Sequence, residues 1–115
     1  MSFEKFEEII AWQKAKKLSV GIYGSLKLCK DFAFKDQIQR AAISIMNNIA
    51  EGFERKGDKE FKRFLFIAKG SCGEVRSMVY LCFEFGYLTK EKCREYYDLS
   101  LEISKILSGL IKTLN

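Results

Sequence analysis

Glu51, Glu54 and Glu74 are the best candidates in this sequence for carboxylates that could do chemistry. Glutamates on the helices of a bundle can hold a metal ion. The chain has no histidine, which excludes Ser-His-Asp and Cys-His nucleophiles, the Glu-x-x-His pairs of di-iron bundles and most zinc hydrolase sites. Because the three glutamates also lack a paired spacing, we expect no catalytic residues, no metal and no cofactor, and therefore a protein that is not an enzyme.

The sequence contains four cysteines, Cys29, Cys72, Cys82 and Cys93. No two of them form a Cys-x-x-Cys pair, so the spacing indicates neither a zinc site nor a redox motif. Each stands near an apolar helical stripe, where a cysteine behaves as a small hydrophobic residue. We expect buried, unreactive thiols.

Positive charge is gathered in two places, although the net charge is only +5. Residues 11–30 contain five lysines and no acid, and residues 55–63 contain five cations against two acids. Such asymmetry favours a polyanionic partner, and an ordinary solvated face is the alternative. The candidate nucleic-acid-binding residues are Lys14, Lys16, Lys17, Lys27, Lys30, Arg55, Lys56, Lys59, Lys62 and Arg63.

Four segments show apolar residues at three- and four-residue steps, which predicts helices over 7–29, 35–55, 59–85 and 90–113. The 115 residues include no proline and no alternating pattern typical of strands. Short links between long helices predict an all-α, antiparallel up-down-up-down four-helix bundle. We expect one domain over residues 1–115.

The links between these helices carry turn signals. Residues 30–33 break the helical pattern and predict a loop. Gly57 is expected to take the left-handed position after the second helix, with Asp58 capping the third. Gly86 is expected to end the third helix and Thr89 to cap the fourth.

Several aromatic side chains fall outside the predicted core stripes, and the third helix is apolar most of the way round. A helix of this kind is covered by something, because a small monomer rarely exposes a large apolar patch. We expect a homo-oligomer packed through this helix and a neighbouring one. An imperfect helical phase, which would place these rings in the core, is the alternative. The candidate interface residues are Phe53, Phe66, Tyr80 and Phe83.

A polar stripe runs along the second helix and consists of Gln37, Arg40, Ser44, Asn48 and Glu51. Residues at this spacing share one face of a helix. If the stripe is partly buried, its members must hydrogen-bond to one another or to a neighbouring helix. Two interpretations remain open: a network that fixes helix register, and a solvated face.

Several segments in order resemble one bacterial family. They are AWQKA at 11–15, QIQRAA at 37–42, SI at 44–45, NIAEG at 48–52, FKRFL at 61–65, IA at 67–68, GS at 70–71, Glu74 and GYLT at 86–89. The chain is similar over nearly its whole length to the four-helix bundle proteins first noted as reading frames in intervening sequences of 23S rRNA genes, also called S23 ribosomal proteins. Met46 departs from the family pattern, which usually has proline there.

The resemblance implies an up-down bundle that assembles as a homopentamer, in a family with no agreed biochemical activity. A more distant similarity is to the accessory protein of diversity-generating retroelements, a basic pentamer that binds RNA and a reverse transcriptase. We therefore expect an accessory protein that binds RNA through basic surfaces. The alternative is a scaffold that binds another protein, such as a reverse transcriptase, without nucleic acid.

No signal segment or membrane-spanning run is visible in the sequence. The expected location is the cytoplasm, with no membrane partner.

Overall fold

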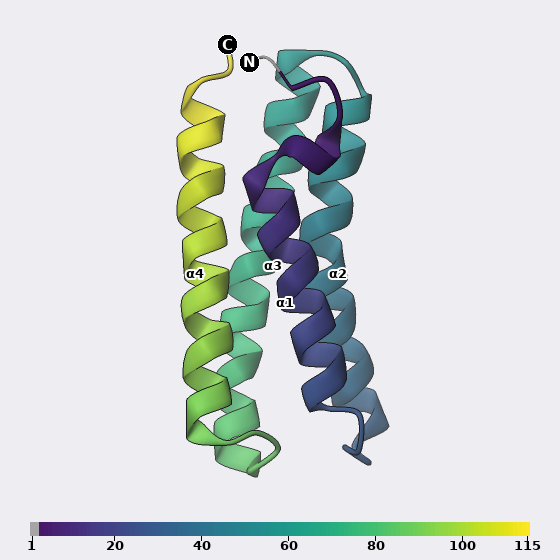
Figure 1. The fold of residues 1–115 in the computed structure, drawn as a ribbon, viewed down its shortest axis with the longest axis vertical. Coiled ribbons are helices and arrows are strands. Elements are labelled where there is room, and N and C mark those ends of the chain that lie inside the picture. The colour runs from purple at the N-terminus through teal and green to yellow at the C-terminus, as the bar shows by residue number, and fades with distance from the viewer. Residues whose placement is uncertain (1–2) are drawn as a thin grey trace.

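The computed structural model describes residues 3–115, which form four long helices running alternately up and down the molecule (Figure 1). No strand is present among these residues. The predicted all-α, antiparallel up-down-up-down four-helix bundle is confirmed. The elements are the short 3₁₀ helix η1 (Phe6–Glu8), α1 (Ile10–Ser25), α2 (Phe32–Glu54), α3 (Asp58–Phe85) and α4 (Lys90–Lys112).

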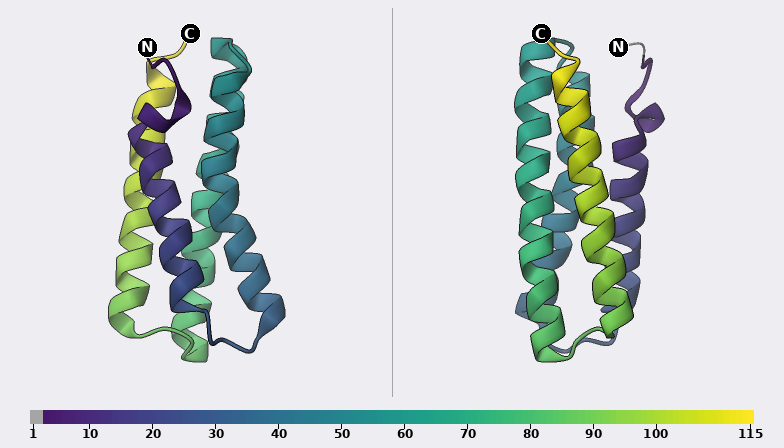
Figure 2. Two further views of the ribbon diagram at one scale, coloured as in Figure 1. Left: turned by 45° about the vertical axis from the view of Figure 1, so that its right-hand side comes forward. Right: turned by 90° about the vertical axis from the view of Figure 1, so that its left-hand side faces the viewer.

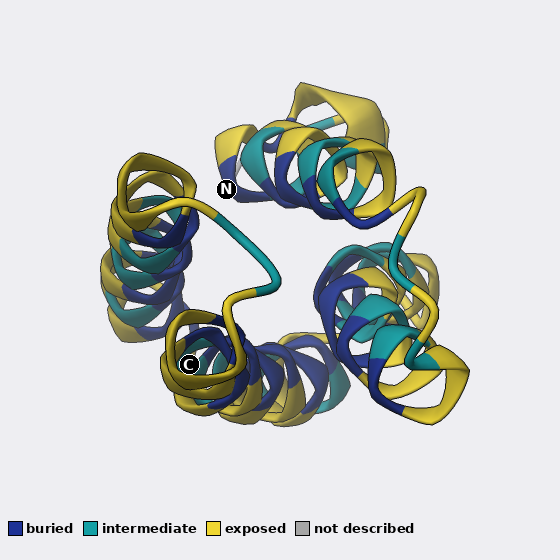
Figure 3. Cartoon of the chain, turned by 90° about the horizontal axis from the view of Figure 1, so that it is seen from below, coloured by how far each residue is buried: buried dark blue, intermediate teal, exposed yellow. Residues whose placement is uncertain are grey.

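Each helix packs against the next along the chain, and α1 also packs against α4, so the four enclose one core. Seen along its length, the bundle turns its buried positions toward the common axis and its exposed positions outward (Figure 3). It measures 43 × 20 × 19 Å. The chain ends lie beside the α2–α3 turn, and the other two links lie at the opposite end (Figures 1 and 2). No helix in the described part of the chain is both long and apolar enough to cross a bilayer.

A buried tyrosine fixes α4 against α1. The Tyr96 hydroxyl donates to the carbonyl oxygen of Gly21 at 2.8 Å and also contacts the Ser25 hydroxyl. A Cβ atom at Gly21 would lie 2.9 Å from Tyr96 Cε1, so only glycine leaves room for the ring. The absence of a side chain at Gly21 therefore lets the Tyr96 ring come close enough for its hydroxyl to be hydrogen-bonded.

The first predicted helix is shorter than expected at both ends, because α1 covers Ile10–Ser25 rather than 7–29. Ile9 has an extended backbone that turns its side chain into the core, where it is almost fully buried. The preceding residues form η1, whose Glu7 carbonyl oxygen accepts from Gln13 Nε2 at 2.8 Å. Burial of the Ile9 side chain is thus favoured here over a helix that continues without interruption.

The predicted loop at 30–33 is wrong over its second half, because α2 begins at Phe32. Asp31 is the N-cap, and its carboxylate accepts from the backbone N–H of Phe34 at 3.2 Å. The Tyr87 hydroxyl donates to the same carboxylate, which ties the two links at this end together. Chiefly this hydrogen bond, and secondly that of Phe34, lowers the pKa of Asp31 from its ordinary value.

The α2–α3 turn differs from the prediction by one residue. Lys56, not Gly57, has the positive φ of 55°, while Gly57 is extended and is the N-cap of α3. Asp58 is the first residue of α3 rather than its cap, and it accepts from the backbone N–H of Asn115 at 3.4 Å. The α3–α4 link is as predicted. Gly86 ends α3 with φ 72°, and Thr89 Oγ1 accepts from the backbone N–H of Lys92.

Candidate nucleic-acid interface

Two arginines at the α2–α3 turn are held by carboxylates of their own chain. Arg55 Nη2 lies 2.9 Å from Glu51 Oε2, and Arg63 donates to both oxygens of Glu60 at 3.0 and 3.2 Å. Both guanidinium groups lie over the ring of Phe64, at 5.1 and 4.5 Å from its centroid. The hydrogen bond from Arg63 is the main cause that lowers the pKa of Glu60. These two predicted cations are therefore fixed and largely neutralised.

The lysines of the same turn are free of such partners. Lys56 and Lys59 are exposed and Lys62 is half-buried. Within residues 3–115, no ion pair includes any of the three. Of the five cations predicted at this turn, three lysines are therefore left without an ion-pair partner.

The five lysines of the first predicted helix do not form one surface. Lys14 pairs with Glu102 of α4 at 3.1 Å, and the Lys16 ammonium lies 5.9 Å from the Trp12 ring centroid. Lys27 and Lys30 follow α1 at the end of the bundle away from the α2–α3 turn. The ten predicted cations are thus spread along a molecule 43 Å long, with Lys14, Lys16 and Lys17 within α1 and the others toward its two ends.

Further cations lie at the end that carries Lys27 and Lys30. Lys35 stands in the first turn of α2, with its ammonium 5.0 Å from the Phe32 ring centroid, and Lys90 and Arg94 stand in the first turns of α4. None of these three is in an ion pair among the residues described. Sequence reasoning missed them because each directly precedes an acidic residue, so the charge over a short segment cancels. Each cation and the acid that follows it point in different directions only once the segment is helical.

The predicted polar stripe divides into one helix link and several exposed groups. Ser44 Oγ lies 2.9 Å from Ser71 Oγ of α3, and Asn48 Nδ2 donates to the carbonyl oxygen and the hydroxyl of Ser44 at 2.8 and 3.0 Å. Gln37, Arg40 and Glu51 are exposed. Arg40 pairs with the neighbouring Asp36 at 2.7 Å. Of the stripe, only Ser44 therefore forms a hydrogen bond to another helix, with a serine that the stripe did not include, and the bonds of Asn48 stay within α2.

Three of the four predicted interface rings lie on the surface. Phe66, Tyr80 and Phe83 of α3 are 56%, 63% and 55% exposed. Phe53 is different: it is half-buried and meets Phe61 edge to face, with the ring centroids 5.9 Å apart. The imperfect-phase alternative therefore holds for Phe53, which packs against the core of its own chain.

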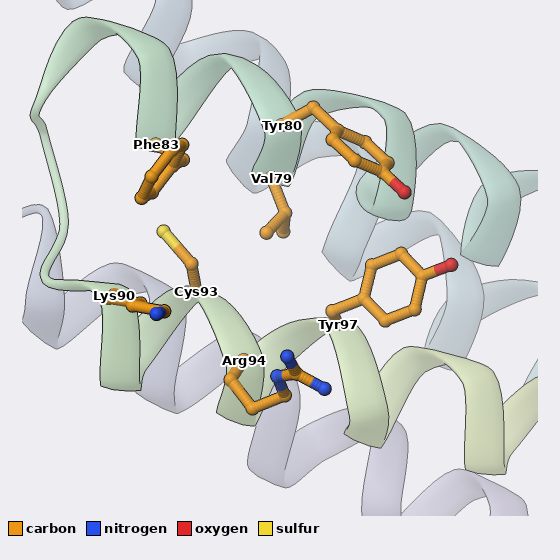
Figure 4. Close-up of a pocket in the computed structure, with 7 residues that line it drawn as sticks. All are labelled: Val79, Tyr80, Phe83, Lys90, Cys93, Arg94 and Tyr97. Carbon is orange, nitrogen blue, oxygen red and sulfur yellow. The ribbon is translucent and has the colours of Figure 1, made fainter.

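Tyr80 and Phe83 border a groove between α3 and α4 (Figure 4). The groove encloses about 340 Å³. At one side of it the rings of Tyr80 and Tyr97 meet edge to face, with centroids 5.9 Å apart and planes at 83°. Its lining residues are Val79, Tyr80, Phe83, Lys90, Cys93, Arg94 and Tyr97.

Comparison with known proteins identifies the relationship. Residues 7–109 match the family model described as "23S rRNA-intervening sequence protein". The chain belongs to this family. A similar solved structure is a crystal structure, at 1.70 Å resolution, of a protein of unknown function from the S23 ribosomal protein family of Bacteroides thetaiotaomicron. It is 29% identical, has a TM-score of 0.83, and the match covers 90% of this chain and 99% of that one. No significant match was found among curated proteins.

The carboxylates considered for catalysis are scattered in this 23S rRNA-intervening sequence protein. Glu51, Glu54 and Glu74 are all exposed, and Glu51 is engaged by Arg55. Within the described residues, no three carboxylate, cysteine or histidine side chains come together as a possible metal site. The cationic ends, the α3–α4 groove and the exposed Phe66 are candidate interaction surfaces.

Proposed function

We propose that this protein is a non-enzymatic, homo-oligomeric accessory protein that binds RNA through its unpaired lysines. The observation that carries the proposal is the absence of carboxylate partners, within residues 3–115, for seven of the ten predicted cations. These are Lys16, Lys17, Lys27, Lys30, Lys56, Lys59 and Lys62.

A lysine without a neighbouring carboxylate keeps its charge available for a phosphate, and each phosphate contact releases condensed counterions. Such contacts give affinity without reading sequence. Assembly strengthens the effect, because each added copy brings a further net charge of +5. The distant resemblance to an accessory protein that binds RNA favours RNA as the polyanion.

Titration of a labelled RNA stem-loop at increasing salt tests the proposal. We expect tight binding at low ionic strength that weakens steeply, with a slope of about −0.9 in log K against log salt for each phosphate contact. Replacing Lys56, Lys59 and Lys62 by glutamine should reduce the magnitude of the slope by about 2 to 3. Lys14→Gln is the matched control and should change it least, because Lys14 already faces Glu102. A wild-type protein that does not bind RNA at low ionic strength contradicts the proposal.

A protein-binding scaffold is the second candidate, and the exposed rings of α3 favour it. Apolar surface of this kind is typical of protein interfaces. The distant resemblance suggests a reverse transcriptase as one partner. Capture of a partner from nuclease-treated lysate, lost when Phe66 is replaced by glutamine, would support the scaffold and oppose RNA binding.

A further inference from the structure

The α3–α4 groove has the composition of a site for a flat, partly apolar group. Val79 and Cys93 lie in its middle, the Phe83 ring stands to one side, and the rings of Tyr80 and Tyr97 stand to the other (Figure 4). Aromatic rings present faces and edges on which a planar ligand can pack. At about 340 Å³, the groove lies at the lower end of the usual size for small-ligand pockets.

The α4 side of the groove is cationic. Lys90 and Arg94 are one helical turn apart and line it from the same face of α4. Arg76 lies one turn before Tyr80 on α3, and its Nη1 is buried without a hydrogen-bond partner. Among the described residues, no carboxylate pairs with any of these three side chains. The two cations that line the groove, Lys90 and Arg94, are therefore without an ion-pair partner in the described part of the chain.

We infer that this groove binds an unpaired nucleotide of single-stranded RNA. The base lies over Val79 and Cys93 between Phe83 and the two tyrosines, and the flanking phosphates lie against Lys90 and Arg94. Rings beside a row of cations are the arrangement by which proteins hold single strands, since stacking accepts any base and the cations follow the backbone. The inference rests on the proposed function and assigns it a specific site.

Charge complementarity distinguishes a nucleotide from the other occupants of an apolar groove. A second copy of this chain is a less suitable occupant, because a subunit with a net charge of +5 would meet a rim that is itself cationic. Phe66 is 14 residues from Tyr80 along α3, about 21 Å at 1.5 Å per residue. The inference assigns Tyr80 and Phe83 to the ligand and leaves assembly to the part of α3 around Phe66.

The test compares binding of a labelled RNA stem-loop, a single-stranded oligoadenylate and a fully paired RNA duplex by fluorescence anisotropy. The wild type should bind the two probes with unpaired nucleotides more tightly than the duplex. The double variant Tyr80→Leu, Tyr97→Leu should bind the oligoadenylate roughly tenfold or more weakly, because one stacked base is worth that much or more. The double variant Tyr80→Phe, Tyr97→Phe keeps both rings and should bind as the wild type does.

Charge is tested on the same helix. Arg94→Gln should weaken binding of the oligoadenylate several-fold, and Lys105→Gln, which removes an exposed unpaired cation farther along α4, should change it much less. Ultraviolet cross-linking of the wild-type protein to the same RNA should modify Tyr80, Phe83 or Tyr97. Circular dichroism and light scattering establish that each variant keeps its fold and mass.

The outcomes separate failure of the inference from failure of the proposed function. RNA binding that is unchanged by loss of the tyrosine rings overturns the inference and leaves the proposed function standing. Dissociation of the assembly in the leucine variant places the rings in the subunit interface and also overturns the inference. An acidic, aromatic peptide that binds through the rings while oligoadenylate does not makes the groove a protein site. A wild-type protein that binds none of the RNA probes at low salt removes the proposed function and the inference together.

Discussion

Because two of its thiols are buried, the protein should lose stability at alkaline pH. Burial is the main cause that raises the pKa of both Cys72 and Cys82 from 9.0 to about 12. In the unfolded chain these thiols ionise near their ordinary pKa, whereas in the folded protein they stay neutral. The free energy of unfolding is therefore unaffected by them below about pH 9 and falls as the pH rises from 9 toward 12.

At one pH unit above the unfolded value, each thiol should cost about 1.4 kcal/mol. Urea denaturation at about pH 8 and about pH 10 measures this loss. Cys72→Ala should be less stable than the wild type at the lower pH, because it leaves a cavity. Its further loss on going to the higher pH should be smaller by about 1.4 kcal/mol. Equal pH dependence in the two proteins would show that Cys72 ionises normally in the folded state.

At the residue scale, the sequence predicted which side chains are charged and not which charges are available. Arg55 and Arg63 were correctly seen as part of a basic turn, but their pairing with acids was not predicted. Glu51 lies four residues before Arg55 and Glu60 three residues before Arg63, and Arg55 also lies 3.8 Å from Glu60 across the turn. The left-handed residue was missed for a similar reason. Propensity favours Gly57, yet the geometry that joins α2 to α3 places Lys56 there.

At the element scale, one glycine determines how closely α2 and α3 approach. A Cβ atom at Gly52 would lie 2.5 Å from Phe64 Cβ and 3.2 Å from Phe61 Cδ1. The nearest of these atoms is joined directly to the α3 backbone, so it cannot move aside without moving the helix. Gly52→Ala should therefore destabilise the protein by about 1–3 kcal/mol, measured by urea denaturation.

Gly109 provides the matched control, because a Cβ atom there meets nothing within 4 Å. The same substitution in open space should stabilise α4 by about 0.5–1 kcal/mol, as expected from helix propensity alone. Equal effects at the two positions would mean that α2 and α3 are not in contact at Gly52.

The helices themselves were well predicted because their apolar stripes are long. The bounds of α3 and α4 differ from the predicted 59–85 and 90–113 by one residue each. The errors fall where a single tertiary contact outweighs periodicity. Ile9 leaves the helical path to enter the core, and Asp31 starts α2 early by capping it and by accepting from Tyr87.

At the scale of the whole molecule, helical periodicity predicted the bundle. The candidate site could not be predicted in this way, because it is made of residues from different helices. The first and second links lie at opposite ends of a bundle 43 Å long, so Lys27 and Lys30 are separated from the lysines of the α2–α3 turn. In the α3–α4 groove, Phe83 of α3 and Arg94 of α4 line one groove although the α3–α4 link separates them in the sequence. Periodicity along one helix contains no information about such cross-helix neighbours.

Assembly is the remaining property that belongs to the whole molecule. Phe66 is 56% exposed in the middle of a helix and Phe32 is 67% exposed near the end of the bundle, beside lysines. If copies associate through α3, Phe66→Gln should lower the mass measured by light scattering and make it depend on concentration, because buried apolar area holds the copies together. Phe32→Gln makes the same chemical change outside that surface and should leave the mass unaltered. Neither exposed substitution should change the free energy of unfolding of the subunit by more than about 0.5 kcal/mol.

A wild-type protein that remains a single subunit at high concentration contradicts association through α3. RNA binding would then depend on one subunit with a charge of +5.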